Sequence, residues 1–205
     1  MLAKNEEGMR ERILELKAFE QEIAEIFNRG EIRAPVHLTR GNERQLLNVF
    51  KWVKPQDWVL SQWRSHYHCL LKGVPKDRLM LDIKVGRSIA LCYPDHRILC
   101  SAIVGGILPI ALGIAWSIKR SGKDEQVWVF VGDMTAATGM FSECSRYAWA
   151  HQLPVSFVIE DNGKSVCTPT NKVWKGQQLS PGQLFHRYEY DLPWPHAGAG
   201  KRVQF

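Results

Sequence analysis

Two short apolar runs constrain the fold of this chain more than any other feature. Residues 127–131 read VWVFV and residues 155–159 read VSFVI, and residues 137–151 between them have helical character. Neither run shows a regular apolar–polar alternation, which is typical of strands that are covered on both faces. A helix between two such strands connects them in parallel, so the pattern predicts a right-handed βαβ unit in a parallel sheet.

Helical patterns precede this unit. Apolar residues at three- and four-residue spacing predict an amphipathic helix over residues 5–28, ended by a left-handed Gly30. Further helices are expected from Glu43 to Val53, from Trp58 to Leu71, and over residues 106–119, the last apolar enough to be buried on every side. Glycines and prolines predict irregular structure in residues 72–100 and after Thr170.

Length and composition indicate one globular unit. The 205 residues can bury a core without disulfides, and 45% hydrophobic with 23% charged residues is a globular balance. We expect a single domain over residues 1–205. It would comprise an N-terminal helical region (1–57), a core (58–170) and an irregular tail (171–205).

Charge and cysteine content exclude several classes of protein. The net charge of +6 is spread along the chain without a run of five like charges, which favours an ordinary basic protein without a nucleic-acid partner; a site for a small anion is the alternative. Five cysteines without a CxxC pair fit reduced thiols in a cytoplasmic protein better than zinc. The longest apolar stretch, residues 103–118, is short for a bilayer and contains Gly and Pro, so no membrane span is expected.

Polar residues follow both predicted strands. The first run ends in Gly132-Asp133, and the second ends in Glu160-Asp161-Asn162-Gly163. Ligands of parallel sheets bind beyond the carboxyl ends of the strands, where Asp133 and Asn162 would meet. Their oxygens suit Mg²⁺ or Ca²⁺, and N–H groups after Asp133 could hold a phosphate. The alternative is that Asp133 merely caps the next helix.

The segment that contains both strands resembles a known cofactor motif. It runs from Gly132 to Thr170 and reads GDMTAATGMFSECSRYAWAHQLPVSFVIEDNGKSVCTPT. It is similar to the thiamine diphosphate motif, which opens with Gly-Asp-Gly and closes with Asn-Asn. The 26 residues between Met134 and Asp161 match that motif's spacing. The continuation is most similar to the alpha subunits of 2-oxo acid dehydrogenases.

Three upstream segments resemble the same family in the same order. They are EIAEIFNRGEIRAPVHLTRGNE (22–43), SQWRSHYHCLLKGV (61–74) and SAIVGGILPIALGIAWSIKRSGKDEQ (101–126). The chain is therefore identified as a shortened member of the alpha-subunit family. The resemblance implies an α/β fold in which helices flank a parallel sheet, the diphosphate-type cofactor domain, truncated at its C-terminus.

The resemblance assigns a metal site and a cofactor site. Asp133 and Asn162 would ligate Mg²⁺ (with Ca²⁺ or Mn²⁺ as substitutes) through their side chains, and Lys164 through its backbone carbonyl. Thiamine diphosphate would be held by residues of the matched segments: Trp63, Arg64, Ala102, Val104, Gly132, Met134 and Thr135. Arg64 and the N–H groups of Met134 and Thr135 would bind the diphosphate, although Met134 stands where the family has glycine.

Three histidines complete the implied site. His37 and His66 match family histidines near the reacting carbon, where they would transfer protons. In the tail, His196 is a candidate replacement for a family histidine that contacts the diphosphate, with Lys201 and Arg202 adding charge. The alternative is a tail that packs on a partner subunit.

The implied function is cleavage of the C–C bond next to a carbonyl, as in 2-oxo acid decarboxylation or dehydrogenation. The catalytic glutamate would come from a beta-type subunit that carries the pyrimidine-binding domain, in an α2β2 assembly, so the chain alone should be inactive. Ala90 replaces a family histidine, which leaves transfer to a lipoyl carrier open. The alternatives are half of a split transketolase-like or carboligase enzyme acting on ketoses, and a non-catalytic scaffold.

Overall fold

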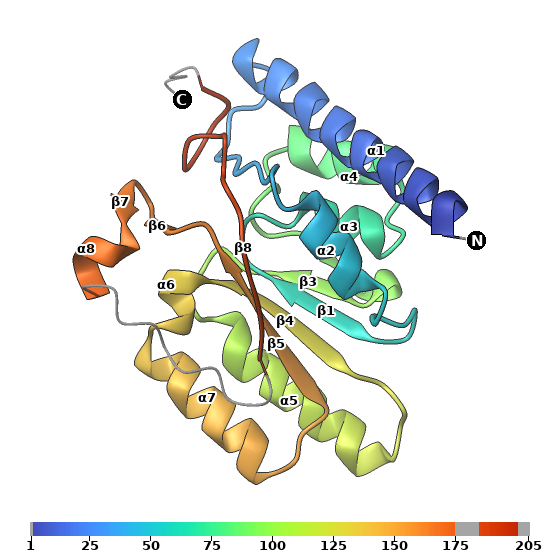
Figure 1. Ribbon diagram of the computed structural model, residues 1–205, viewed down its shortest axis with the longest axis vertical. Coiled ribbons are helices and arrows are strands. Elements are labelled where there is room, and N and C mark those ends of the chain that lie inside the picture. Colours follow the sequence, from blue (N-terminus) through green and yellow to red (C-terminus); the bar gives the residue numbers. More distant parts are fainter. Residues whose placement is uncertain (1, 175–184, 201–205) are drawn as a thin grey trace.

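The computed structural model describes residues 2–174 and 185–200, which form three layers (Figure 1). The middle layer is a six-stranded sheet in the order β2-β3-β1-β4-β5-β8. Its strands are β1 (Trp58–Ser61), β2 (Cys92–Tyr93), β3 (Ile98–Cys100), β4 (Val127–Gly132), β5 (Val155–Asp161) and β8 (Phe185–Glu189). A hairpin of β6 (Lys164–Ser165) and β7 (Thr168–Pro169) lies outside this sheet.

Helices cover both faces of the sheet (Figure 1). One layer contains α1 (Leu2–Asn28), α2 (Glu43–Phe50), α3 (His66–Leu71) and α4 (Lys76–Lys84). The opposite layer contains α5 (Ile107–Ser121) and α7 (Gly139–Ala150). The short elements are η1 (Pro94–His96), α6 (Asp133–Ala136) and α8 (Thr170–Trp174). None of the helices within the described ranges is long and apolar enough to cross a membrane.

The predicted βαβ unit is confirmed. Strands β4 and β5 pair in parallel from Val127↔Val155 to Gly132↔Glu160, and α7 connects them. The missing alternation has the expected cause, since both faces of β4 are buried. Val129 faces the core under α5 and α7, whereas Phe130 faces the core under the N-terminal helices.

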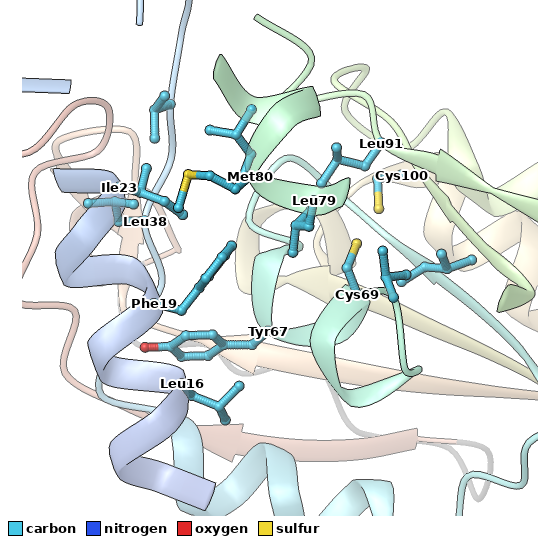
Figure 2. Packing of buried hydrophobic residues seen from close by; sticks show 14 of the residues in the cluster. Leu16, Phe19, Ile23, Leu38, Tyr67, Cys69, Leu79, Met80, Leu91 and Cys100 are labelled. Carbon is cyan, nitrogen blue, oxygen red and sulfur yellow. The ribbon is translucent and has the colours of Figure 1, made fainter. Parts of the chain in front are cut away.

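The N-terminal helices are held by an apolar core of their own. Figure 2 shows Leu16, Phe19 and Ile23 of α1 directed toward α3 and α4, where they meet Tyr67 and Leu79. The amphipathic helix is thus confirmed, and Gly30 takes the left-handed conformation expected after it (φ 77°). Burying each such side chain stabilises the fold by about 1.5–3 kcal/mol.

Two local predictions between residues 58 and 100 are wrong. Residues 58–71 form no continuous helix: Trp58–Ser61 is strand β1, which pairs in parallel with both β3 and β4. A short strand buried on both faces has no period that separates it from a buried helix. Residues 72–100 are also not irregular, because they form α4, β2, η1 and β3.

The helix predicted over residues 106–119 exists as α5, but it is not buried on every side. Pro109, Ile110, Gly113 and Ser117 are exposed, while Ala111 and Ala115 face the core. The preceding loop exposes further apolar surface, with Ile103 71% and Val104 57% exposed. The outward face of α5 therefore has no cover within the described residues.

The tail predicted to be irregular is partly regular. Helix α8 begins at Thr170, and β8 joins the sheet in parallel with β5, from Phe157↔Phe185 to Asp161↔Glu189. The chain then returns to the N-terminal layer, where Gly198 donates its N–H to the carbonyl of Val36 at 2.8 Å. The tail thus crosses the edge of the sheet at which the candidate site lies.

Candidate functional site

The carboxyl ends of five strands meet at one edge of the sheet. Strands β3, β1, β4, β5 and β8 run parallel, so the residues that follow them gather there. These residues are Gln62 to Arg64 after β1, Ser101 to Val104 after β3, Asp133 after β4, Asn162 after β5 and Tyr190 after β8. The edge contains most of the residues that the sequence assigned to the site.

Asp133 is the first residue of α6 and is partly buried. Its Oδ2 atom is buried without a hydrogen-bond partner among the described residues. Burial, and then the charge of Asp161, raise the pKa of Asp133 to about 6. Gly132, not Asp133, occupies the N-cap position, so the capping alternative is not what the structure shows. A buried carboxylate oxygen without a partner is a group that a cation would satisfy.

The turn after β5 contains the other two predicted metal ligands. The Oδ1 atom of Asn162 accepts the N–H of Lys164 at 3.0 Å, and the side chain of Asn162 hydrogen-bonds the hydroxyl of Tyr190. Lys164 is exposed at the start of β6. An amide oxygen has a second lone pair, so the contact with Lys164 leaves Asn162 able to ligate a metal.

The donor set of this edge differs from that of a typical zinc site. Among the described residues, no three or more His, Cys, Asp or Glu side chains are grouped to hold a metal ion. The predicted site uses one carboxylate, one amide oxygen and one backbone carbonyl, a set of hard oxygen donors that suits Mg²⁺. The residues that are present therefore fit the implied cation.

Gln62 is a site residue that the sequence reasoning missed. Its Oε1 atom accepts the N–H of Gly132 at 3.1 Å, and its Nε2 atom donates to Oγ1 of Thr135 at 2.9 Å. Gln62 thereby links the end of β1 to the start of α6, in which Met134 and Thr135 form part of the first turn. Gln62 could have been found from its position directly after a strand. Because residues 58–71 were predicted to form a helix, that strand was not recognised.

A second cluster forms around Arg64. Its Nη1 atom donates to the carbonyl of Leu38 at 2.7 Å, and Nη2 donates to the carbonyl of His196 at 2.8 Å. The ring of His37 lies 4.9 Å from that of His196 and 6.0 Å from that of Trp63, between centroids. The structure thus brings His37, Trp63, Arg64 and His196 together, whereas Lys201 and Arg202 lie outside the described residues.

The guanidinium of Arg64 has no carboxylate in direct contact among the described residues, although the charges of Glu20 and Glu160 act on it from further away. Within residues 2–174 and 185–200, no carboxylate oxygen lies within 4.0 Å of its guanidinium. Burial lowers the pKa of Arg64 from its ordinary value. A partly buried arginine that contacts only carbonyls and a histidine presents its positive charge to an anion.

The environment of His37 keeps its ring neutral. Burial, and then the charge of Arg64, lower the pKa of His37 to about 3. Burial, followed by the charge of Arg64, also lowers the pKa of His196. The Nδ1 atom of His37 is buried without a hydrogen-bond partner among the described residues. An anion bound at Arg64 would offset the smaller contribution, that of the Arg64 charge, to these low pKa values, while the contribution of burial would remain.

His66 lies beneath this cluster and has no exposed surface. Its Nε2 atom is 2.9 Å from Oγ of Ser88, and its Nδ1 atom is 3.4 Å from Oε1 of Glu20. The Glu20 carboxylate also accepts the N–H of Thr39 at 2.8 and 2.9 Å. His66 is close enough for its charge to contribute to the low pKa of His37, but it has no exposed surface at the open edge, and its catalytic role stays a prediction.

Ala102 and Val104 are exposed in the loop between β3 and α5. An added Cβ at Gly105 would lie 3.3 Å from Sδ of Met140, which places this loop against the start of α7. The two residues lie at the same edge of the sheet as Asp133. Their exposure agrees with a surface that is completed by something outside this chain.

Fold and edge together define a three-layer α/β protein with a polar site at the carboxyl ends of a parallel sheet, where such proteins bind cofactors. A scan against protein-family models matches residues 11–182 to the family described as dehydrogenase E1 component. The match covers most of the chain, and the chain belongs to this family. The resemblance found in the sequence is confirmed.

Curated relatives are similarly named. The alpha-3 subunit of the chloroplastic pyruvate dehydrogenase E1 component of Arabidopsis thaliana is 31% identical, covering 85% of this chain and 46% of the relative. The alpha subunit of acetoin:2,6-dichlorophenolindophenol oxidoreductase of Bacillus subtilis is 32% identical, over 78% of this chain and 51% of the relative. The alpha subunit of the pyruvate dehydrogenase E1 component of Porphyra purpurea is 30% identical, over 70% of this chain and 47% of the relative. The chain spans about half the length of these relatives.

Proposed function

We propose that this chain is the alpha-type, cofactor-binding subunit of a heteromeric enzyme that depends on thiamine diphosphate and acts on a 2-oxo acid. One observation carries the proposal: Asp133, at the motif position of the metal ligand, has a buried oxygen without a partner among the described residues. The proposed ligands of Mg²⁺ are Asp133, Asn162 and the carbonyl of Lys164. Mn²⁺ and Ca²⁺ are proposed substitutes.

The diphosphate would lie against Arg64. Support comes from the lack of a carboxylate in contact with this arginine among the described residues, and from its place on the same edge of the sheet as Asp133. Gly132, Met134 and Thr135 would approach the diphosphate from the other side, where Gln62 holds the start of α6. Trp63 and His196 would border it, and Ala102 and Val104 would contact the aminopyrimidine.

When bound, thiamine diphosphate supplies the nucleophilic carbon and the electron sink for cleavage of a C–C bond next to a carbonyl. The residues of this chain bind and orient it. His37, whose pKa is about 3 in this structure, would accept a proton near the reacting carbon only once a bound diphosphate offsets the neighbouring charge of Arg64 and raises that pKa. We propose that His66 acts behind it, oriented by Ser88 and Glu20.

A beta-type partner would supply the pyrimidine-binding domain and the catalytic glutamate. The uncovered apolar surface of α5 and its preceding loop supports this part of the proposal, because exposed apolar patches mark sites of association. We propose an α2β2 assembly. Two relatives are named for pyruvate dehydrogenase, which favours a 2-oxo acid substrate over a ketose, whereas one is named for the oxidation of acetoin, a hydroxyketone.

Turnover measurements test the proposal. The purified chain with thiamine diphosphate, Mg²⁺, pyruvate and an artificial electron acceptor should show negligible activity. Adding a beta-type partner chain should produce turnover at least about a hundredfold higher, because the missing acid–base group is then present. Full activity of the chain alone would contradict the proposal, as would equal turnover of pyruvate and ketose phosphates by the complex.

A further inference from the structure

Asp161 distinguishes this chain from the motif that it matches. The motif closes with two asparagines, whereas this chain has Asp161 followed by Asn162. The exchange adds a second carboxyl group, which lies within hydrogen-bonding reach of Asp133. Two carboxylates at such a separation repel each other unless a cation lies near one of them.

Arg187 supplies that cation from the tail. It lies on β8, where it pairs in register with Ile159, and its guanidinium donates to Oδ2 of Asp161. The other oxygen of Asp161, Oδ1, accepts the N–H of Gly163 at 2.8 Å. Both oxygens of Asp161 are thus engaged within the chain, whereas Asp133 keeps a buried oxygen without a partner among the described residues.

We infer that Arg187 is a positioning residue, which neutralises Asp161 and ties the turn from Asp161 to Lys164 to β8. Of the two neighbouring carboxylates, Asp133 is then the one that is offered to a divalent cation. The turn that carries Asn162 and Lys164 is fixed at one end by the ion pair and internally by the N–H of Gly163. The inference rests on the proposed metal site and adds the tail strand to it.

The inference predicts that restoring the asparagine of the family motif at position 161 weakens metal binding. Asp161→Asn restores the asparagine of the motif, yet it leaves the charge of Arg187 without its carboxylate partner beside the proposed metal site. We expect the affinity for Mn²⁺ to fall about tenfold in this variant. The double variant D161N/R187Q removes both charges and should bind within about threefold of the parent chain. Arg187→Lys keeps the charge and should likewise retain the affinity within about threefold.

The probe is Mn²⁺ alone, titrated into the 205-residue chain and followed by the electron paramagnetic resonance of the free ion. Arg97→Gln is the matched control, since Arg97 pairs with Glu125 at 3.5 Å beside the opposite ends of the strands. It should leave the affinity unchanged. Thermal unfolding without metal verifies that each variant is folded.

The outcomes separate the inference from the proposed function. If D161N binds like the parent, or if the second substitution does not restore binding, Arg187 has no such role while the metal site stands. If D161N does not fold, a loss beyond about tenfold in Arg187→Lys overturns the inference in the same way. A parent chain that binds no Mn²⁺ removes the proposed metal site, and the inference with it.

Discussion

Arg64 donates a hydrogen bond to the backbone carbonyl of His196, 132 residues later in the chain, at 2.8 Å. This contact brings the tail across the edge of the sheet and over the arginine that we propose for the diphosphate. The ring of His196 lies close as well, with Nδ1 3.3 Å from Nη2 of Arg64. The tail is thus part of the candidate site and not a separate appendage.

His196→Ala should weaken the binding of thiamine diphosphate about three- to tenfold, because the ring beside Arg64 is lost while the carbonyl remains. Calorimetric titration in the presence of Mg²⁺ measures the change. His151→Ala is a suitable control, since that ring packs on Trp116 and Tyr147, away from the site. An unchanged affinity in His196→Ala would assign the tail a purely structural role.

The partly buried ring of His37 should make the chain sensitive to acid. Its folded-state pKa of about 3 lies below the ordinary 6.5, so between these pH values the unfolded chain binds a proton that the folded chain does not. Stability is therefore lost as the pH falls below 6.5. His37→Gln lacks this effect. When the pH is lowered from 7.5 to 5, the free energy of unfolding measured with urea should fall less in the variant than in the parent chain. The expected difference is about 1–2 kcal/mol, after allowance for solvent screening. A shift of the opposite sign would contradict the burial of a neutral ring.

A substitution of Phe19 tests how α1 packs against the helices that cover the sheet (Figure 2). Phe19→Ala should lower the free energy of unfolding by about 3–5 kcal/mol, because it leaves a cavity beside Tyr67 and Leu79. Leu14→Ala, on the same helix at a position that is 60% exposed, should change it by less than about 0.5 kcal/mol. Equal effects of the two substitutions would show that α1 does not pack as described.

Gln62 links β1 to α6, so its loss should affect both stability and binding. Gln62→Leu leaves the N–H of Gly132 without its acceptor and should destabilise the chain by about 1–3 kcal/mol. The affinity for thiamine diphosphate should fall with it, because the start of α6 is no longer held. Gln126→Leu is the control: Gln126 bonds Ser156 at 3.0 Å near the opposite ends of the strands, and its loss should spare the affinity. Equal losses of affinity would refute a local role for Gln62.

Much of the fold could be predicted where the local sequence decides it. Strands β4 and β5 are apolar because both faces are buried, and their ends fix the positions of Asp133 and Asn162. Strand β8, with the sequence FHRYE, could not be predicted, because it is held in the sheet by backbone pairing with β5 and by polar contacts from Arg187 and Tyr188 to Asp161 and Glu160. Such contacts join residues far apart in sequence and have no local period.

The same limit applies to the site. Asp133, Asn162, Arg64 and His37 could be proposed from a motif and from strand ends. Gln62 and Arg187 act through residues 70 and 26 positions away, so only the three-dimensional structure reveals them. The exposed face of α5 was missed for a related reason. A helix with an exposed apolar face has the same composition as a helix that is buried within its own chain, so composition does not separate the two.

The central claim is that Asp133 and Arg64 mark a metal-dependent site for thiamine diphosphate, and calorimetric titration of the cofactor tests it most directly. The chain should bind thiamine diphosphate with Mg²⁺ and lose that binding in EDTA. Asp133→Ala should weaken it at least about a hundredfold, since it removes a charged ligand of the metal. Binding that is absent, or that is unaffected by EDTA and by this substitution, would contradict the account and favour a non-catalytic scaffold.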